Sequence, residues 1–456
     1  MVGTLKTKMI PFSVAVIVGA VNLLWASHAV AQTPEATLEG RAVLPADTFA
    51  PGPPSGSGLD ADEVVGGRDP PFEDQPVGGV SAVLDAGGGE YLVMADNGFG
   101  TKGNSADFLL RLYRVRPNFG DGDVRVRSYV QLRDPDDRIP FEITNENTAE
   151  RFLTGADFDI ESVRQDFRGD LWFGDEFGPF LLHTDIYGRV LEAPIPLEGV
   201  RSPENPSLGS GEEPNLPSSK GFEGMAASPD GAFLYPMLEG ALGPDPEQRR
   251  RTIFEFDVAS GRYTGARWEY RAESPENSVG ELVALDENRF LVVESDDRQG
   301  REARFKKIFV VDLRYTGEDG FLLKEEEVDL LSIRDPARIS EPAREGDVGL
   351  SDPFSFPFRT VESVLPVGDG SLLVLNDNNY PSDAGRNPGR PDDTEAIIVR
   401  PFALPATGGP PLLIPVAPLA GVFVLLALRS PQRTRGTRHA VSRSKEMLPS
   451  PDFSRW

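Results

Sequence analysis

The stretch ADFDIESVRQDFRGDLWFGDEFG, residues 156–178, contains the structural unit on which this chain is built. Two short apolar runs flank a Gly-Asp turn at residues 169–170, which is the pattern of a β-hairpin. The first run begins at Glu161 and the second ends at Asp175 and Glu176. Because the first strand of an antiparallel hairpin starts beside the end of the second, these three carboxylates are predicted to meet at one edge.

The same hairpin plan recurs along the chain. Similar units begin at Glu223, Glu281 and Glu362, and a fifth unit begins at Ser81. In four of the five units an acid follows the leading position at one constant spacing. These pairs are Ser81 and Asp96, Glu161 and Glu176, Glu281 and Asp296, and Glu362 and Asp377. In the unit that begins at Glu223, the acid comes one place later, at Glu239.

Repeated small antiparallel sheets predict an all-β chain, folded as a β-propeller of five to six blades. The leading positions are unevenly spaced, so a sixth blade fits in either of the two long intervals, from Ser81 to Glu161 or from Glu281 to Glu362. A strand expected at residues 36–44 would complete the last blade and close the ring. The first strand of each propeller blade lines the central channel, so the leading glutamates are expected to converge at one mouth.

Composition narrows the possible functions. The chain has 456 residues and no cysteine, which excludes disulfides, zinc-thiolate sites and a cysteine nucleophile. Its formal charge is −26, and residues 32–428 alone carry −33 once the +2 of residues 1–31 and the +5 of residues 429–456 are set aside. Such a surface repels phosphate backbones and attracts cations, so we expect no nucleic-acid partner. For most of these acids, solubility is a sufficient explanation.

Common catalytic motifs are missing. The sequence has no Gly-x-Ser-x-Gly elbow, no His-Glu-x-x-His and no phosphate-binding Gly-x-x-x-x-Gly-Lys loop. Of the three histidines, His28 and His439 lie near the ends of the chain, which leaves His183. His183 follows an apolar strand, where it has either a packed, hydrogen-bonded role or a catalytic one.

The remaining candidates for a functional site are side-chain oxygens that could bind a metal ion. Carboxylates crowded at one mouth raise one another's pKa unless a cation compensates, and Ca²⁺ accepts six to eight oxygen ligands. The predicted Ca²⁺ ligands are Glu161, Asp175, Glu176, Glu223, Glu281, Glu362 and Asp377. The predicted catalytic residues, acting through that ion, are Glu161, Glu223, Glu281 and Glu362. The basic residues beside these motifs, predicted to bind substrate, are Lys220, Arg298, Arg386 and Arg390.

Structural roles explain the same residues in another way. A glutamate at a strand start can accept backbone N–H bonds from the neighbouring blade and keep the channel in register. The four basic residues can equally be solvated or paired with nearby acids.

Both ends of the chain carry targeting patterns. Lys6 and Lys8 precede the apolar run Met9–Trp25 and an Ala-x-Ala site, which predicts a signal peptide at residues 1–31, the alternative being a retained anchor. Residues 32–76 hold the N-terminal strand and a Pro/Gly-rich loop, and residues 77–403 form the expected propeller domain.

Residues 404–456 combine the motif LPATG, an apolar run at residues 412–428 and a basic tail. They resemble a sortase sorting signal, which implies cleavage between Thr407 and Gly408 and attachment to the cell wall. A simple membrane anchor through the apolar run is the alternative.

The repeated units, together with GDLWFGDEFGPFLL (residues 169–182) and GRNPGRPDD (residues 385–393), resemble the phytase-like family described as having esterase-like activity. The resemblance extends from about Val77 to Arg400. It implies a secreted β-propeller that hydrolyses phosphate monoesters or other esters.

Three functions are therefore considered. The first is an exported, surface-anchored, Ca²⁺-dependent hydrolase of small phosphate esters, acting as a monomer. The second is a non-catalytic surface module that binds a ligand or partner and holds Ca²⁺ as a structural ion. The third is a metal-dependent lactonase or carboxylesterase.

Overall fold

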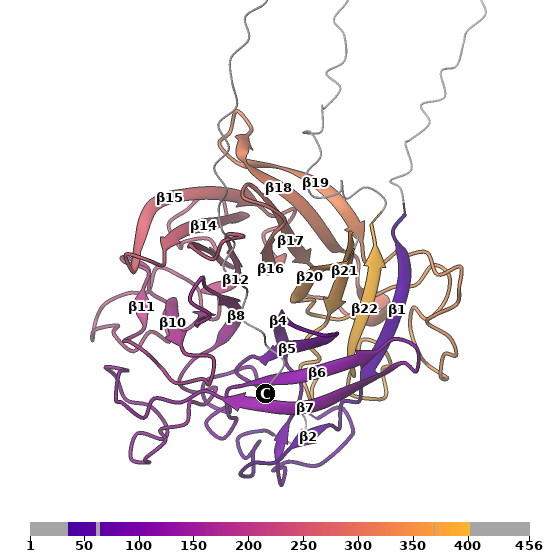
Figure 1. Cartoon of the computed structure of the whole chain (residues 1–456), viewed down its shortest axis with the longest axis horizontal. Coiled ribbons are helices and arrows are strands. Elements are labelled where there is room, and N and C mark those ends of the chain that lie inside the picture. The colour runs from indigo at the N-terminus through magenta and orange to yellow at the C-terminus, as the bar shows by residue number, and fades with distance from the viewer. Residues whose placement is uncertain (1–34, 61–63, 369, 402–456) are drawn as a thin grey trace, which may run out of the picture. The chain divides into compact units, whose positions relative to one another are not determined.

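The computed structural model describes residues 35–60, 64–368 and 370–401. The regular structure of these residues is almost entirely β, and Figure 1 shows the sheets arranged radially around a central axis. Within the described ranges, no helix has the length and apolar character needed to cross a bilayer. The predicted signal peptide, LPATG motif and apolar run at residues 412–428 lie outside the described residues.

The described residues form five four-stranded antiparallel blades. Blade 1 contains β4 (Val80–Gly87), β5 (Glu90–Ala95), β6 (Arg111–Asn118) and β7 (Asp123–Gln131). Blade 2 contains β8 (Ile160–Gln165), β9 (Leu171–Asp175), β10 (Phe180–Thr184) and β11 (Ile195–Pro196). Blade 3 contains β12 (Phe222–Ala227), β13 (Phe233–Leu238), β14 (Arg250–Asp257) and β15 (Arg262–Arg271).

The remaining two blades complete the ring. Blade 4 contains β16 (Ser278–Ala284), β17 (Arg289–Ser295), β18 (Lys306–Thr316) and β19 (Leu322–Asp329). Blade 5 contains β20 (Ser363–Val367), β21 (Ser371–Leu375), β22 (Thr394–Arg400) and β1 (Thr37–Leu44). The other regular elements are the short pair β2 (Phe49–Ala50) and β3 (Gln75–Pro76) and one 3-10 turn, η2 (Gly300–Glu302). The prediction of an all-β propeller is confirmed, with five blades among the described residues.

The N-terminal strand closes the ring. β1 pairs antiparallel with β22 from Thr37 opposite Arg400 to Leu44 opposite Thr394. A parallel bridge between Val43 and Asp123 then joins blade 5 to blade 1. The two long intervals between repeats contain extended loops at residues 132–159 and 330–362 instead of a sixth blade.

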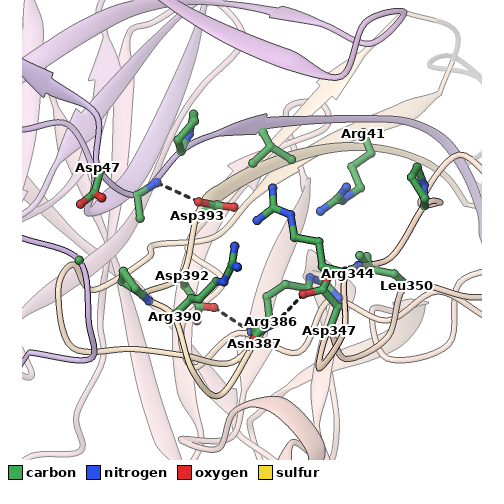
Figure 2. A pocket seen from close by; sticks show the side chains of 16 residues that line it. Arg41, Asp47, Arg344, Asp347, Leu350, Arg386, Asn387, Arg390, Asp392 and Asp393 are labelled. Carbon is green, nitrogen blue, oxygen red and sulfur yellow. Dashed lines mark hydrogen bonds between the residues drawn. The ribbon is translucent and has the colours of Figure 1, made fainter.

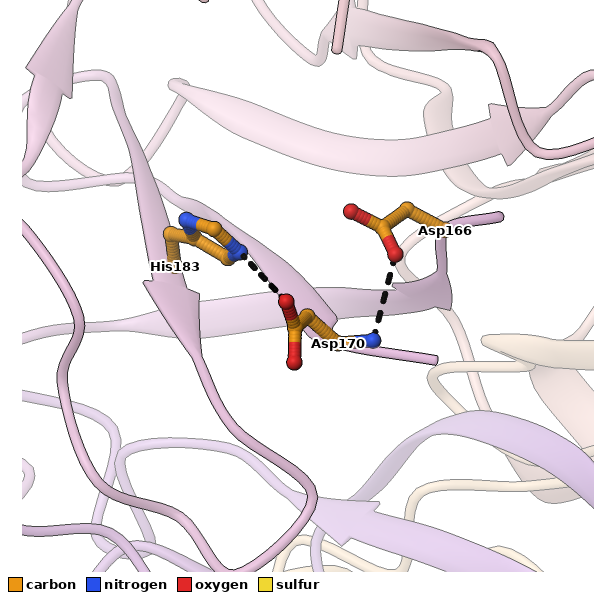
Figure 3. Close-up of side chains that lie close together, drawn as sticks. All are labelled: Asp166, Asp170 and His183. Carbon is orange, nitrogen blue, oxygen red and sulfur yellow. Dashed lines mark hydrogen bonds and ion pairs between the residues drawn. The ribbon is translucent and has the colours of Figure 1, made fainter. Parts of the chain in front are cut away.

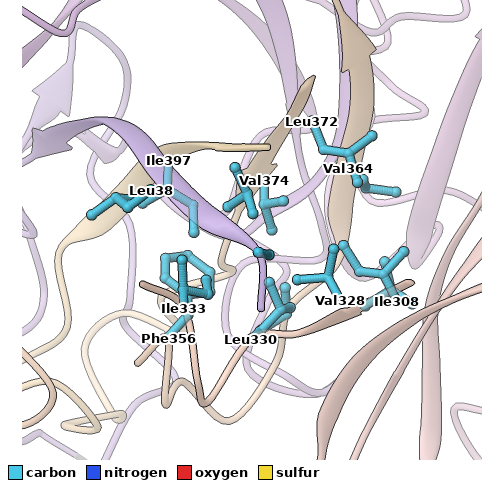
Figure 4. Packing of buried hydrophobic residues seen from close by; sticks show 14 of the residues in the cluster. Leu38, Ile308, Val328, Leu330, Ile333, Phe356, Val364, Leu372, Val374 and Ile397 are labelled. Atoms are coloured by element: carbon cyan, nitrogen blue, oxygen red, sulfur yellow. The ribbon is translucent and has the colours of Figure 1, made fainter. Parts of the chain in front are cut away.

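Apolar side chains pack between the blades. Five clusters of buried residues each lie between two blades that are neighbours in the ring. The cluster between blades 4 and 5 includes Ile308 of β18 together with Val364 and Ile397 of blade 5 (Figure 4). A small twisted sheet cannot bury both of its faces alone, so neighbouring blades cover one another and hold the inner strands β4, β8, β12, β16 and β20 around the channel.

Candidate metal centre at the channel mouth

β-Bulges shape the inner strands of three blades at the leading positions found in the sequence. Where the first strand of the blade pairs with the second, one residue of the first strand is left unpaired between Val80 and Ala82 in blade 1. In blade 2, one residue is likewise unpaired between Ile160 and Ser162. A similar irregularity lies between Phe222 and Met225. The residues within these bulges are Ser81, Glu161, and the pair Glu223 and Gly224. Because a bulge changes the direction of a side chain, it accounts for the break in strand alternation at these positions.

A repeated backbone hydrogen bond positions the second acid of the pair in blades 1, 2 and 3. The amide of Glu176 donates to the carbonyl of Asp159 at 2.9 Å, and the amide of Glu239 donates to the carbonyl of Gly221 at 2.9 Å. In blade 1 the corresponding bond joins Asp96 and Gly79, at 3.0 Å. Each acceptor lies two residues before a leading position, so the strand-end acid is held beside the leading side chain.

Carboxylates from several blades converge in three overlapping groups. In each group, one oxygen from every member lies within 4.8 Å of the others. The groups are Asp159 with Glu161 and Glu176, Glu161 with Glu223 and Glu362, and Glu176 with Glu223 and Glu239. All of these residues are buried. Blades 2, 3 and 5 therefore contribute to one shared acidic centre.

Burial and mutual repulsion raise the pKa of these carboxyls. Burial is the largest cause of the raised pKa of Glu161, followed by the charges of Glu223 and Asp159. The pKa of Glu223 is raised by burial and then by Glu239 and Glu176. Without a cation, several of these groups resist ionisation near neutral pH.

Blades 1 and 5 extend the same electrostatic centre. Burial and then the charges of Asp377 and Asp96 raise the pKa of Glu362, whose carboxylate accepts a 2.9 Å hydrogen bond from the Ser81 hydroxyl. Burial raises the pKa of Asp377 to about 6, although its oxygens accept hydrogen bonds from Asn379 and Thr360. The acidic centre thus reaches from blade 5 across to blade 1.

The donor set fits a hard divalent cation. Asp159 Oδ1 and Glu176 Oε1 are buried without a hydrogen-bond partner, and both residues belong to the same group of three carboxylates. Buried polar atoms without partners are costly, and a cation would satisfy these two. Because the groups contain only carboxylates, they suit Ca²⁺ or Mg²⁺ better than softer metals.

Asp175 is a predicted metal ligand, but both of its carboxylate oxygens accept hydrogen bonds from backbone amides. Oδ1 accepts the amide of Asp159 at 2.9 Å, and Oδ2 accepts the amide of Gly178 at 2.7 Å. The carboxylate is outside the three groups. Burial raises its pKa to about 7. Asp175 thus positions Asp159 from the end of β9.

Glu281 does not occupy the same register as the other leading glutamates. Val279 pairs with Glu294 as Ile160 pairs with Asp175, so Gly280 corresponds to Glu161. The predicted equivalence of Glu281 and Asp296 with the other pairs is therefore wrong by one position. Sequence spacing misses this shift because the bulge falls before the glutamate in β16.

Blade 4 consequently supplies no carboxylate at the leading position. A Cβ atom on Gly280 would lie 2.4 Å from the carbonyl oxygen of Val361, so the approach of blade 5 requires glycine there. Glu281 lies outside the three groups and forms a 2.7 Å ion pair with Arg164 of β8. Burial raises the pKa of Glu281 to about 7, and Arg164 opposes this shift.

Lys220 is the predicted substrate-binding residue that lies at the centre. Its ammonium pairs with Glu239, and the side chain is 40% exposed. Burial lowers its pKa, but the charges of Glu239 and Glu176 more than compensate, and the net shift is upward. Lys220 therefore supplies positive charge at the edge of the acidic groups.

The other predicted basic residues lie elsewhere. Arg386 is buried and donates to both oxygens of Glu395, at 2.8 and 2.9 Å. Arg390 is exposed and lines a cavity of about 300 Å³ together with Arg386 and Arg344 (Figure 2). Arg298 is exposed in the loop after β17.

Two members of the acidic groups are absent from the predicted ligand set. Asp159 lies two residues before Glu161, so a second acid stands close to the leading glutamate in the sequence, although the bulge at Glu161 breaks strand alternation there. That spacing is a usable signal. Glu239 ends the repeat that begins at Glu223, but it comes one place later than the acids of the other repeats, which obscured the match. The bulge between Phe222 and Met225 places it with the other strand-end acids.

Comparisons with known proteins give a family match and a distantly related secreted protein. A family model described as "Phytase-like: Esterase-like activity of phytase" matches residues 75–380. An uncharacterized secreted protein of Arthroderma benhamiae is 25% identical over 174 residues, which cover 30% of this chain and 34% of that protein. The chain thus spans about a third of the length of this curated relative.

Two solved structures are similar at low identity. A luciferin-regenerating enzyme is 13% identical with a TM-score of 0.34, and the match covers 72% of this chain and 79% of that chain. Virginiamycin B lyase from Staphylococcus aureus is 10% identical with a TM-score of 0.28, and the match covers 69% and 64% of the two chains.

Proposed function

Because the chain belongs to the phytase-like family, we propose that it is a metal-dependent ester hydrolase that acts on small phosphate monoesters with Ca²⁺ at the channel mouth. The observation that supports this proposal is the convergence of overlapping carboxylate groups from three blades, with two buried oxygens left without partners.

The proposed ligands of the ion are the side chains of the three acidic groups. Asp159 and Glu176 offer the two unpartnered oxygens, and Glu161 and Glu223 each belong to two of the three groups. The remaining ligands are Glu239 and Glu362. Three other predicted ligands lie outside the groups: Asp175 accepts backbone amides, Glu281 pairs with Arg164, and Asp377 accepts hydrogen bonds from Asn379 and Thr360. When bound, the cation supplies Lewis-acid stabilisation for the anionic oxygen of a phosphoryl or acyl group and lowers the pKa of a coordinated water.

Lys220 is the side chain we assign to the substrate anion. Its ammonium lies beside Glu239 at the edge of the acidic groups and remains partly exposed. An ammonium at this place favours an anionic ester over a neutral one, because it offsets the repulsion from the carboxylates. The exposed Arg298 and Arg390 stay proposed contacts for larger substrates, whereas Arg386 is committed to Glu395.

The test is hydrolysis by the full chain with Ca²⁺ supplied. We expect Ca²⁺-dependent phosphate release from phytate or a chromogenic phosphate ester, and its loss in the presence of a chelator. Glu161→Gln combined with Glu223→Gln should abolish release, while the exposed Glu198→Gln is the matched control. Lys220→Met should raise KM for phosphate esters more than it lowers kcat.

Other outcomes select other functions. Hydrolysis of lactones or carboxyl esters without phosphate release would replace the substrate class. Saturable Ca²⁺ binding with no turnover on any of the three ester types would contradict the hydrolase and favour the surface-binding module. The double variant also separates the roles of the ion: activity lost at an unchanged melting temperature indicates a catalytic ion, and loss of both indicates a structural one.

We also propose export and attachment to the cell wall. The supporting observations are the signal-peptide pattern at residues 1–31, the LPATG motif at residues 404–408, and a relative named as a secreted protein. Mass spectrometry of wall-released protein should find an N-terminus at Gln32 and a C-terminal residue of Thr407. Intact protein in the membrane fraction would instead favour an anchor through residues 412–428.

A further inference from the structure

A second cluster of metal-ligand side chains lies at the opposite end of the β8–β9 hairpin from the mouth. Asp166 follows the last residue of β8, Asp170 precedes β9, and His183 lies on β10 beside them (Figure 3). Glu161 is five residues before Asp166 along an extended strand, a separation of roughly 16 Å at about 3.3 Å per residue. The cluster is therefore separate from the carboxylates at the mouth.

The three side chains converge on a common point. One ligand atom from each of Asp166, Asp170 and His183 lies within 4.8 Å of the others. His183 Nε2 is 3.7 Å from Asp170 Oδ2, which is beyond hydrogen-bonding distance. Two ligands of one tetrahedral zinc ion lie roughly 3.3 Å apart, given metal–ligand bonds of about 2.0–2.2 Å. A small rotation of the partly exposed Asp170 side chain would bring the pair to that spacing.

The imidazole of His183 is oriented for coordination. His183 is only 6% exposed, and its Nε2 atom is buried without a hydrogen-bond partner. Its other nitrogen, Nδ1, lies 2.7 Å from Glu192 Oε1. With the proton on Nδ1, the Nδ1–H group donates a hydrogen bond to Glu192. The lone pair of Nε2 is then directed toward the two aspartates. This carboxylate–imidazole arrangement is the usual second shell of a metal-bound histidine.

Packing fixes the ring in this orientation. The imidazole stacks on Trp172 with ring centroids 3.9 Å apart and planes at 9°. The Trp172 indole N–H donates to Asp166 Oδ2 at 3.1 Å, so one tryptophan positions both a nitrogen and an oxygen ligand. Asp166 Oδ1 also accepts the amides of Arg168 and Asp170. A carboxylate has about four acceptor positions, so Asp166 retains one for a metal.

We propose that Asp166, Asp170 and His183 bind one divalent transition-metal ion of the Zn²⁺ class, with Glu192 orienting the histidine. An imidazole nitrogen combined with carboxylates suits Zn²⁺, Co²⁺ or Ni²⁺, whereas Ca²⁺ takes oxygen ligands. Such an ion ties the β8–β9 turn to β10 and stabilises blade 2 at the end remote from the mouth. The site is independent of the proposed hydrolase activity.

The test is a calorimetric titration of the full chain with Zn²⁺. Excess Ca²⁺ is present throughout to fill the mouth. We expect one zinc site that His183→Gln weakens by more than tenfold and that Glu192→Gln weakens by about tenfold. His439→Gln is the matched control, because it removes a histidine outside the described residues and should leave the affinity unchanged. Glu223→Gln should also leave zinc binding unchanged, which separates this site from the mouth.

A second readout does not depend on heats of binding. Co²⁺ and Ni²⁺ should quench the fluorescence of Trp172, and Asp170→Asn should prevent the quenching. Asp170 has a 28% exposed side chain, so this variant tests the site even if His183→Gln fails to fold. Equal zinc affinity in wild type, His183→Gln and Asp170→Asn, or no zinc binding in wild type, would overturn the proposal and leave an ion pair between His183 and Asp170 only.

Discussion

Arg164 on β8 and Glu281 on β16 form a 2.7 Å ion pair between blades 2 and 4, which are not neighbours in the ring. Arg164 also donates to the carbonyl of Leu282 at 3.0 Å, so the guanidinium holds both the side chain and the backbone of β16. This pair explains why one of the conspicuous glutamates of the sequence is absent from the acidic groups at the mouth.

Arg164→Met should destabilise the protein and leave Ca²⁺ affinity nearly unchanged. Removing one partner of a buried ion pair typically costs about 3–5 kcal/mol, because the other charge stays buried without compensation. The loss should lie near the lower limit, since the pKa of Glu281 is already about 7 and the carboxyl can take up a proton. Chemical denaturation measures the change, with the exposed Arg298→Met as the control. A large loss of Ca²⁺ affinity would place Glu281 in the metal centre instead.

Gly280→Ala should destabilise the interface between blades 4 and 5. The added Cβ would lie 2.4 Å from the carbonyl oxygen of Val361, which is backbone and cannot rotate away. Overpacking of this kind costs about 1–3 kcal/mol. Gly103→Ala is a suitable comparison, because the atom closest to its added Cβ would be the Thr101 hydroxyl oxygen at 4.0 Å. Equal stability of the two alanine variants would contradict this explanation. For the same steric reason, Gly280→Glu should fail to add a fourth leading carboxylate at the mouth.

Glu223→Gln should have opposite effects on the metal-free and Ca²⁺-bound proteins. The side chain repels Glu239, Glu176 and Glu362, so neutralising it should raise the melting temperature in the presence of a chelator. The same change removes a ligand, so the additional stabilisation by Ca²⁺ should shrink. Differential scanning calorimetry with and without Ca²⁺ measures both effects, and Glu198→Gln should change neither. A lower melting temperature in chelator would show that Glu223 has a structural role without metal.

The stability of the metal-free protein should fall as pH rises from about 5 to about 8. Burial raises the pKa of Asp159 to about 6 and of Asp175 to about 7, from ordinary values of 3.8. The native state therefore holds protons that the unfolded chain has already released, and their stabilising effect is complete below the unfolded pKa and lost as pH rises through the folded values. Thermal unfolding across this pH range checks the slope.

Two controls accompany this measurement. Saturating Ca²⁺ should flatten the slope, because the cation favours the ionised carboxylates. As the pH falls below 4.5, the ordinary pKa of a glutamate, stability should also decrease. Burial tends to raise the pKa of Glu395, but Arg386 and Arg41 overcome this effect and lower it to about 2, so protonation of Glu395 at low pH removes a stabilising charge. A metal-free stability that rises steadily with pH between about 5 and 8 would contradict the crowding of unpaired carboxyls at the mouth.

Much of the fold was predictable because its signals are local. The hairpin at residues 156–178 shows its turn and both strands within one window, and its recurrence identifies the blades. The closing strand was predictable as well, since Leu38, Ala42 and Leu44 alternate with other residues in a short segment before the first repeat. The blade count was not fixed, because the intervals from Ser81 to Glu161 and from Glu281 to Glu362 accommodate either long loops or a further sheet.

Local sequence was enough to define the strand repeats, the ring, and the placement of acids at strand starts and ends, because alternation and turn residues act within a few positions of each other. Which acids share a centre depended instead on the folded chain. A bulge shifts register by one residue without changing the local pattern, and close approach of blade 5 requires glycine at Gly280. Glu281 was thereby directed to Arg164, while Asp159 and Glu239 were brought to the mouth, through contacts between residues that are far apart in the chain.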